Sequence, residues 1–486
     1  MKKAFLVVLI VSLKAISSYS QLISDTLVVR YSKKQVDSIY ALNNLNLVSF
    51  IIGPTKYSIK IYRLKYKTLD AHGDTTTASG ALFIPEYLAC SAPLMSYQHA
   101  TTTKKTDVPS YLSQESLIGI IFSTDGYVVS MPDYVGLGDS PGTHAYMNIK
   151  VTTSASIDMM RASKQFCAAH NIALNGKLFL MGYSQGGHAT VGLHHELETN
   201  LSTEFHVTAS APASGPYALS DLIEAGIKSD TAFDYEGVLP AMLLRYQDMY
   251  GNIYDSIPQM FVAPYKTTLP PLLDGTHLIT DVNAAMPAPA KLIFDSLYYK
   301  NYVSDSLHPF KVAARLNDVN YSWLPVAPVK LYYCKGDHAV PNKIAIDLYN
   351  KFIAAGASTS NVQKSDLGNY SHLDCAKFAT INTKQWFDTF VQRCADAGVN
   401  DEPGSELQME ISPNPFSTET NIRFSNPASF PFELRIINLM GQEVLKKQNI
   451  KGETVSLTNE GLPAGSYILV LKGDRIYHGM VCHNAR

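Results

Sequence analysis

Gly182-Tyr183-Ser184-Gln185-Gly186 has the pattern G-x-S-x-G and is the segment that most strongly indicates the fold of this chain. Residues 177–181 before it are mostly apolar and predict a buried strand, whereas residues 187–197 after it predict a helix. A sharp turn between a strand and a helix is the context in which this pattern exposes a nucleophilic serine at the top of a sheet. The two glycines let strand and helix approach each other without clashing side chains. Ser184 then lies beside the positive end of the helix and is a candidate nucleophile.

Strands alternate with helices on both sides of this motif. The expected strands are residues 57–68, 78–84, 92–97, 127–132, 177–181, 207–210, 329–334 and 362–367, and the expected helices are residues 117–125, 152–169, 187–197 and 376–390. This order predicts an α/β fold with a mostly parallel sheet and helices on both faces. Between about residues 217 and 325 the strand signal is weak, and tyrosine, leucine, methionine and proline are frequent. We interpret this segment as a mainly helical insertion.

A nucleophilic serine needs a base, and the base needs an acid that orients it. With this motif the acid and then the histidine follow the serine along the chain. Asp337 lies just past the expected strand 329–334, beside Gly336, and we select it as the acid, with a helix N-cap as its alternative role. His372 follows the last expected strand and is the candidate base. His338, next to the acid, is the alternative base.

Attack by a serine on a carbonyl group also requires two N–H groups about 3 Å from the oxygen on which negative charge develops. The N–H of Gln185, immediately after the candidate nucleophile, is the first expected donor of this oxyanion hole. The second is expected from the polar loop after strand 92–97, where His99 and Ala100 are the candidates. The alternative is that this segment is an ordinary polar loop.

The overall composition limits the class of protein. The chain has 486 residues, which is enough for about two or three domains. Its 40 Lys and Arg residues against 42 Asp and Glu residues give a net charge of -2, which argues against a nucleic-acid-binding protein, because such proteins carry basic surfaces. We expect no metal and no cofactor, since no C-x-x-C or histidine-rich spacing indicates zinc.

The first twenty residues have the pattern of a secretory signal peptide. A positive start is followed by the apolar residues 4–13, and small residues stand at positions 18 and 20. A membrane anchor is the alternative, but Lys14 interrupts the apolar run, which is short for a span. We therefore expect a secreted chain that begins at Gln21 after cleavage. No later stretch is long and apolar enough to cross a bilayer.

Export permits disulfides, and the chain has six cysteines. Six cysteines allow many pairings, and the sequence does not choose between them. We expect Cys334, which lies in a core strand, to be a buried thiol. A bond between Cys375 and Cys394 is one candidate pairing.

The character of the chain changes after residues 396–409, which contain Asp-Glu-Pro-Gly-Ser and are typical of a linker. We assign residues 21–395 to the α/β domain and residues 410–486 to a second domain. The second domain has expected strands at residues 421–425, 432–438, 443–447, 454–457 and 466–472, separated by turn residues. This pattern predicts a small antiparallel β-sandwich. A carbohydrate-binding module is one alternative for it.

Four motifs of the larger domain carry a family resemblance. Residues 98–101 (QHAT), 132–140 (PDYVGLGDS), 144–146 (HAY) and 182–187 (GYSQGG) together resemble the secretory lipase family of α/β-hydrolases. The resemblance covers roughly residues 50–395 and implies a serine esterase or lipase with a helical lid, acting on a small-molecule or lipid ester. In the family the oxyanion loop often reads His-Gly-Thr, and here Ala100 replaces the glycine. A serine peptidase of the same fold and a non-catalytic surface binding protein are the alternatives.

Three motifs of the second domain carry another resemblance. Residues 412–416 (SPNPF), 437–444 (INLMGQEV) and 461–467 (GLPAGSY) resemble the type A sorting domain of the bacterial type IX secretion system. The resemblance implies a targeting β-sandwich that binds the secretion machinery. It also implies export through the periplasm to the cell surface or the medium.

Overall fold

The computed structural model describes residues 21–42, 54–232, 234–391 and, with short gaps, 409–483. The expected signal peptide and nearly all of the expected linker lie outside the described residues. No helix of the described part of the chain combines the length and the apolarity needed to cross a bilayer.

The larger domain is built on one mixed sheet, which contains nine strands within the described residues. In spatial order these are β1 (Leu22–Tyr31), β2 (Ile59–Leu69), β3 (Thr75–Pro85), β5 (Val128–Pro132), β4 (Ala92–Gln98), β6 (Leu174–Tyr183), β7 (Val207–Ala213), β8 (Val329–Tyr333) and β9 (Val362–Asp366). The first four pair antiparallel, and the strands from β5 to β9 pair parallel. The predicted α/β class is confirmed, and β1 is a strand that the sequence pattern did not indicate.

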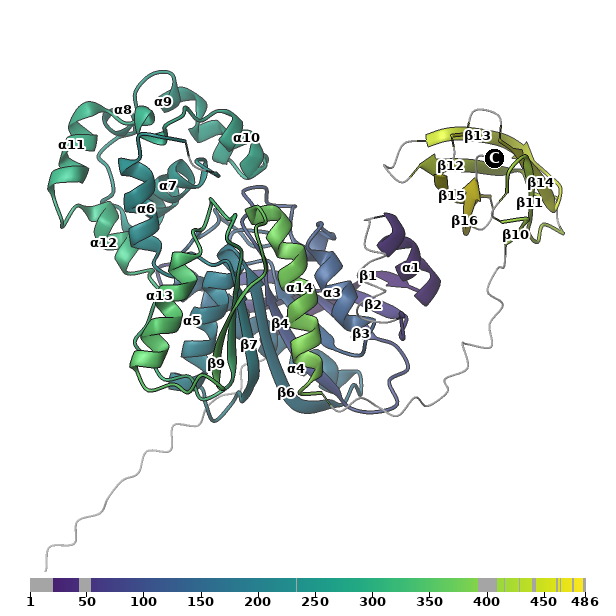
Figure 1. The fold of residues 1–486 in the computed structure, drawn as a ribbon, viewed down its shortest axis with the longest axis horizontal. Helices are drawn as coiled ribbons and strands as arrows, with labels where there is room; N and C mark the ends of the chain where they lie inside the picture. Colours follow the sequence, from purple (N-terminus) through teal and green to yellow (C-terminus); the bar gives the residue numbers. More distant parts are fainter. Residues whose placement is uncertain are drawn as a thin grey trace, which may run out of the picture.

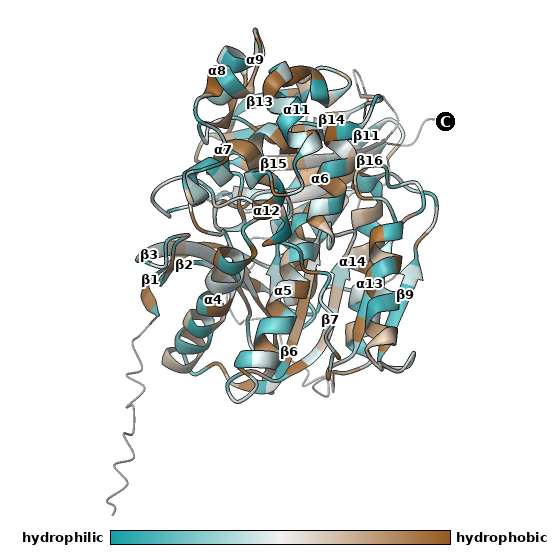
Figure 2. Ribbon diagram, turned by 90° about the vertical axis from the view of Figure 1, so that its left-hand side faces the viewer, coloured by the Kyte–Doolittle hydropathy of each residue, from teal (hydrophilic) through white to brown (hydrophobic). Residues whose placement is uncertain are grey.

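Helices cover both faces of the sheet (Figure 1). One face packs against α3 (Ser116–Ser123) and α14 (His372–Asp388), and the other against α4 (Ile149–Ala169), α5 (Gln185–Asn200) and α13 (Lys343–Ala354). Along β6 the side chains alternate between the two faces, as the pleat of a strand requires. Phe179 joins the α3 and α14 side, whereas Leu180 joins the α4 and α5 side. Figure 2 shows hydrophilic and hydrophobic residues mixed along α4 and α13, as expected for helices with one face on a sheet.

The predicted insertion is helical and forms a cap, defined here as α6 to α12. Its α-helices are α6 (Leu219–Lys228), α7 (Val238–Tyr250), α8 (Ile257–Met260), α9 (Tyr265–Thr268), α10 (Ile279–Ala284), α11 (Ser296–Ser304) and α12 (Pro309–Arg315). The cap has a hydrophobic cluster that includes Leu243, Tyr246 and Phe261 and that Tyr146 and Met147, from the segment before α4, also join. Figure 1 shows these helices gathered at one end of the sheet.

The C-terminal residues form two antiparallel sheets, as the sequence predicted. Within the described residues one sheet has the order β10 (Glu410–Ser412), β11 (Glu419–Arg423), β14 (Thr454–Thr458), and the other has the order β13 (Glu443–Ile450), β12 (Phe432–Asn438), β15 (Gly465–Lys472), β16 (Ile476–His483). Their inner faces share a cluster that includes Phe424, Leu434 and Leu469. The sequence pattern did not indicate β10 and β16.

The cysteine expectations were wrong. Cys334 and Cys375 form a disulfide with a Cα–Cα distance of 6.1 Å, so Cys334 is not a thiol and Cys375 does not pair with Cys394. The physical reason is that the end of β8 lies against the first turn of α14, a contact that spacing in the sequence does not reveal. Cys90 is also disulfide-bonded, and Cys167 is a buried thiol.

Candidate active site

Ser184 stands at the sharp turn between β6 and α5, as its motif predicted. Its backbone has φ 57° and ψ −119°, a left-handed conformation that is strained for a residue with a Cβ atom. A Cβ atom on Gly186 would lie 1.8 Å from the main-chain oxygen of Gln98, and one on Gly182 would lie 2.2 Å from that of Gly186. Only glycine therefore fits at these two positions, and the tight turn holds Ser184 clear of both elements.

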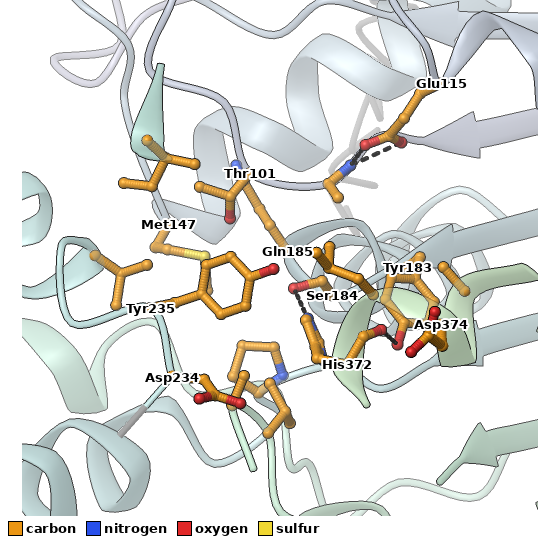
Figure 3. Close-up of a pocket in the computed structure, with 18 of the residues that line it drawn as sticks. Thr101, Glu115, Met147, Tyr183, Ser184, Gln185, Asp234, Tyr235, His372 and Asp374 are labelled. Atoms are coloured by element: carbon orange, nitrogen blue, oxygen red, sulfur yellow. Dashed lines mark hydrogen bonds between the residues drawn. The ribbon is translucent and has the colours of Figure 1, made fainter. Parts of the chain in front are cut away.

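The structure brings Ser184, His372 and Asp337 together. The Nε2 atom of His372 lies 2.8 Å from the Oγ atom of Ser184 (Figure 3). Its Nδ1 atom lies 2.7 Å from Oδ2 of Asp337. His372 is the first residue of α14, whose N-cap Ser371 accepts a hydrogen bond from the N–H of Asp374. The three side chains thus form a continuous chain of hydrogen bonds from a carboxylate to a hydroxyl group. His338, the alternative base, is exposed to solvent.

Both oxygens of the Asp337 carboxylate accept hydrogen bonds. Its side chain is fully buried, and its Oδ1 atom accepts hydrogen bonds from the N–H groups of Ala339 (3.1 Å) and Val340 (2.8 Å). Since Oδ2 is an acceptor, Nδ1 of His372 donates to it. Nε2 is then free of a proton and accepts from the Ser184 hydroxyl group. This tautomer is the one that a general base needs.

Two tyrosines hold the His372 segment. The hydroxyl group of Tyr183 donates to the main-chain oxygen of His372 at 2.5 Å, and the two rings lie 5.1 Å apart. The ring of Tyr235, from the segment before α7, meets the imidazole edge-on at 5.7 Å. The imidazole is therefore restrained by its hydrogen bonds and by packing on two sides.

Gln185 occupies the position predicted for the first oxyanion donor, as the first residue of α5. The first N–H groups of a helix have no partner within the helix. The side-chain amide of Gln185 contacts Nε2 of His144 at 3.3 Å, and Nδ1 of His144 donates to the main-chain oxygen of Val135 at 3.2 Å. Burial lowers the pKa of His144 to about 3, so its imidazole is neutral and Nε2 accepts from the amide. His144 thereby orients the side chain that follows the nucleophile.

The loop after β4 holds the two residues expected to supply the second oxyanion donor, His99 and Ala100. His99 is buried, and its ring nitrogens lie 2.7 Å from the oxygen of Ala100 and 3.1 Å from that of Asp133. The N–H of Ala100 is directed to Glu115, with 3.0 Å to each carboxylate oxygen (Figure 3). The N–H of Ala100 is therefore already bonded in this structure, and His99 is not among the residues that line the cavity beside Ser184. The next residue, Thr101, lines the same cavity, which Ser184 also lines, and within the described residues its N–H makes no hydrogen bond.

Sequence reasoning missed Glu115 because its partner is distant in the chain and no motif surrounds it. A lone carboxyl group ahead of an apolar helix is ordinarily a solvated or capping residue. Only the fold places it beside Ala100.

Ser184 lines a cavity of about 920 Å³ between the cap and the rest of the larger domain. Gln185, Glu115 and His372 also line it. Apolar side chains from both parts of the protein supply most of the wall, among them Leu219, Leu222, Ile223, Leu239, Met242 and Ile279 from the cap and Leu117, Ile118, Leu373 and Ile381 from α3 and α14. A cavity of this size and character accommodates a small apolar molecule.

Two family models match separate parts of the chain. The model of the secretory lipase family matches residues 110–389, and the model of the secretion system C-terminal sorting domain matches residues 410–478. Among curated protein sequences, none matches the chain.

Solved structures resemble the larger domain. A crystal structure from Legionella pneumophila, described provisionally as a hydrolase, has 26% sequence identity and a TM-score of 0.68 and covers 76% of this chain and 98% of its own. The rice cell wall degrading esterase LipA from Xanthomonas oryzae has 28% identity and a TM-score of 0.64, with coverage of 76% and 96%. Candida antarctica lipase A, at 19% identity, a TM-score of 0.58 and coverage of 78% and 86%, shares the fold.

Proposed function

The chain belongs to the secretory lipase family, and from that premise we infer that it is a serine hydrolase that cleaves carboxylic esters through an acyl-enzyme on Ser184. Its family and its esterase neighbour make it a hydrolase of the lipase and esterase type. The observation that carries the serine mechanism is the hydrogen-bond chain from Asp337 through His372 to Ser184.

In the proposed reaction the Oγ atom of Ser184 attacks the carbonyl carbon of the ester while Nε2 of His372 takes the hydroxyl proton. The imidazolium then gives this proton to the leaving alkoxide oxygen, and the acyl group stays on Ser184. Water attacks the acyl-enzyme with His372 again as the base, and the carboxylic acid leaves. Asp337 holds the imidazole in the required tautomer and stabilises its charged form.

The tetrahedral intermediate carries negative charge on the former carbonyl oxygen. We assign its donors to the N–H groups of Gln185 and Thr101. Gln185 follows the nucleophile at the N-terminus of α5, where the helix dipole also favours negative charge. We choose Thr101 rather than Ala100 as the second donor, because Thr101 lines the cavity and its N–H makes no hydrogen bond within the described residues, whereas the N–H of Ala100 is bonded to Glu115. The other expected candidate, His99, does not line the cavity.

The cavity favours an ester with an aliphatic acyl chain. Its wall is mainly apolar, and burial of each CH₂ group of a substrate against such a wall contributes about 0.8 kcal/mol. We therefore propose that acyl chains of medium length are better substrates than acetyl groups.

The sorting domain points to export. Because residues 410–478 match a secretion system C-terminal sorting domain, we propose that this part of the chain binds the type IX machinery and directs the enzyme to the cell surface or the medium. Deletion of residues 410–486 tests this proposal: the enzyme should then remain in the periplasm, and unchanged export would contradict it.

The central test is Ser184→Ala, assayed on nitrophenyl esters of increasing acyl length beside nitroanilides of the same acyl groups. We expect ester hydrolysis to fall by a factor on the order of 10⁶, with the fold retained by circular dichroism. The wild type should also be labelled at Ser184 by a fluorophosphonate. Retained turnover in the variant would refute the mechanism, faster anilide than ester cleavage would favour a peptidase, and failure of labelling would favour a binding protein.

A further inference from the structure

Glu115 is a carboxyl group in the apolar part of the cavity wall. Its neighbours in the lining include Leu117, Ile118 and Tyr97. It is the N-cap residue of α3, yet its side chain makes no capping hydrogen bond to that helix. Its carboxylate instead accepts the N–H of Ala100 on both oxygens at 3.0 Å and the hydroxyl group of Tyr97 on Oε2 at 2.8 Å.

This placement opposes ionisation of the group. Burial raises the pKa of Glu115, while His99, the Ala100 amide and the Tyr97 hydroxyl group lower it in part. The side chain is therefore turned away from its own helix and bonds to the loop after β4, beside the candidate active site.

The contact fixes the peptide that precedes the proposed second oxyanion donor. Ala100 and Thr101 are adjacent, so the orientation of the Ala100 amide limits where the Thr101 amide can point. The side chain of Thr101 is also restrained, because its Oγ1 atom forms a hydrogen bond of 3.0 Å with the hydroxyl group of Tyr146. Glu115 and Tyr146 thus restrain the same turn of chain from two sides.

We propose that Glu115 is a positioning residue that sets the loop after β4 so that the N–H of Thr101 binds the oxyanion. This inference rests on the proposed ester hydrolysis at Ser184. Glu115 does not touch the reacting atoms in this proposal, and it acts through the Ala100 peptide. Its contribution is made in the tetrahedral intermediate, in which the carbonyl oxygen becomes charged, and much less in the bound substrate.

Glu115→Gln is the direct test. A glutamine has one acceptor oxygen and an NH₂ group, so it cannot accept the Ala100 N–H on both of its terminal atoms. We expect kcat on a nitrophenyl ester to fall about 10- to 100-fold while KM changes less than twofold. A trifluoromethyl ketone, which forms a charged tetrahedral adduct with serine, should bind more weakly by the same factor as kcat/KM falls. The matching methyl ketone, which stays uncharged in the site, should bind as before.

Two further variants make the test selective. Asp158→Asn is the matched control, because Asp158 is also a largely buried carboxyl group but lies on α4 and does not line the cavity. It should leave kcat, KM and both inhibitor affinities unchanged. Tyr97→Phe removes one of the hydrogen bonds to Glu115 and should lower kcat two- to fivefold with the same inhibitor pattern. If Glu115→Gln does not fold, Tyr97→Phe tests the proposal in its place.

The outcomes separate this proposal from the one on which it rests. If Ser184→Ala keeps its ester hydrolysis, the proposed function itself fails. If Ser184→Ala is inactive and the folded Glu115→Gln variant has wild-type kcat and trifluoromethyl ketone affinity, only the role of Glu115 is overturned. A loss of both inhibitors to the same extent would also overturn it, since it would indicate general damage to the cavity.

Discussion

The disulfide between Cys334 and Cys375 joins the two segments that carry the acid and the base of the candidate site. Cys334 directly follows β8 and stands three residues before Asp337, and Cys375 lies in the first turn of α14, three residues after His372. Both cysteines are fully buried. The segments of the candidate acid and base are therefore joined by a covalent bond as well as by the hydrogen bond between the two side chains.

Replacing both cysteines by alanine should reduce stability and activity together. The bond closes a loop with a sequence separation of 41, for which the chain-entropy model gives about 4 kcal/mol. We also expect kcat to fall several-fold at temperatures where the variant is still folded, because His372 and Asp337 gain freedom. Thermal unfolding and ester kinetics measure the two effects. Cys167→Ala, which removes a buried free thiol, is the control, and an equal loss in both variants would refute the role of the bond.

Asp337→Asn should inactivate the enzyme without unfolding it. The amide would face Nδ1 of His372 with either an oxygen or an NH₂ group, and the NH₂ orientation reverses the tautomer that the base requires. We expect kcat to fall by about 10⁴. Asp347→Asn, an exposed carboxyl group on α13, should have wild-type kcat. An active Asp337→Asn enzyme would mean that another group orients the imidazole.

Gly186→Ala should disrupt the turn at Ser184. A Cβ atom there would lie 1.8 Å from the main-chain oxygen of Gln98, which cannot move without moving β4. We expect a loss of about 3 kcal/mol or more in the free energy of unfolding, together with loss of activity. Gly176→Ala is the matched control, since its φ is +81° but no atom lies within 4 Å. It should cost about 1–2 kcal/mol and keep kcat. Equal effects of the two variants would argue against close contact at the turn.

The sequence was sufficient for the parts of the site that a local pattern or chain order determines. The G-x-S-x-G pattern requires a strand and a helix around Ser184, and two strand ends after it led to Asp337 and His372, which the structure brings together. Their catalytic roles remain predictions until the variants are measured.

Other features depend on contacts between distant segments, which periodicity does not contain. The Cys334–Cys375 bond requires β8 and α14 to lie side by side, and the hydrogen bond from the N–H of Ala100 to Glu115 requires the loop after β4 to meet the start of α3. β1 escaped detection because much of its length is exposed, so its pattern of apolar residues is weak. The missed features are thus those that tertiary packing decides.

The buried His188 should make stability depend on pH. His188 is 2% exposed, and its Nε2 atom donates to the main-chain oxygen of Asn317 at 2.6 Å. Burial lowers the pKa of His188 to about 4, although the hydrogen bond to Asn317 raises it in part. The unfolded imidazole binds a proton near pH 6.5 while the folded one stays neutral, so stability falls as pH drops from 6.5 to 4. One such group contributes about 1.4 kcal/mol per pH unit in that window.

Chemical denaturation of His188→Gln across this range checks the sign and the slope. The variant should lose this part of the pH dependence, whatever its stability at neutral pH. His72→Gln, at an exposed position, should keep the wild-type slope. If the stability of His188→Gln changes with pH as steeply as that of the wild type between pH 6.5 and 4, other titratable groups determine this pH dependence.

The cap should set the preference for acyl length. Leu222 of α6 lines the cavity, and a tryptophan there would fill space that a chain of several CH₂ groups could occupy. Since each CH₂ group that loses its contact costs about 0.8 kcal/mol, Leu222→Trp should lower kcat/KM for octanoyl esters at least tenfold and leave acetyl esters nearly unchanged. Val312→Trp, on α12 and outside the cavity lining, is the control for a large side chain on the cap. If Leu222→Trp lowers kcat/KM equally for all acyl chain lengths, the acyl chain binds elsewhere in the cavity, along α3 and α14.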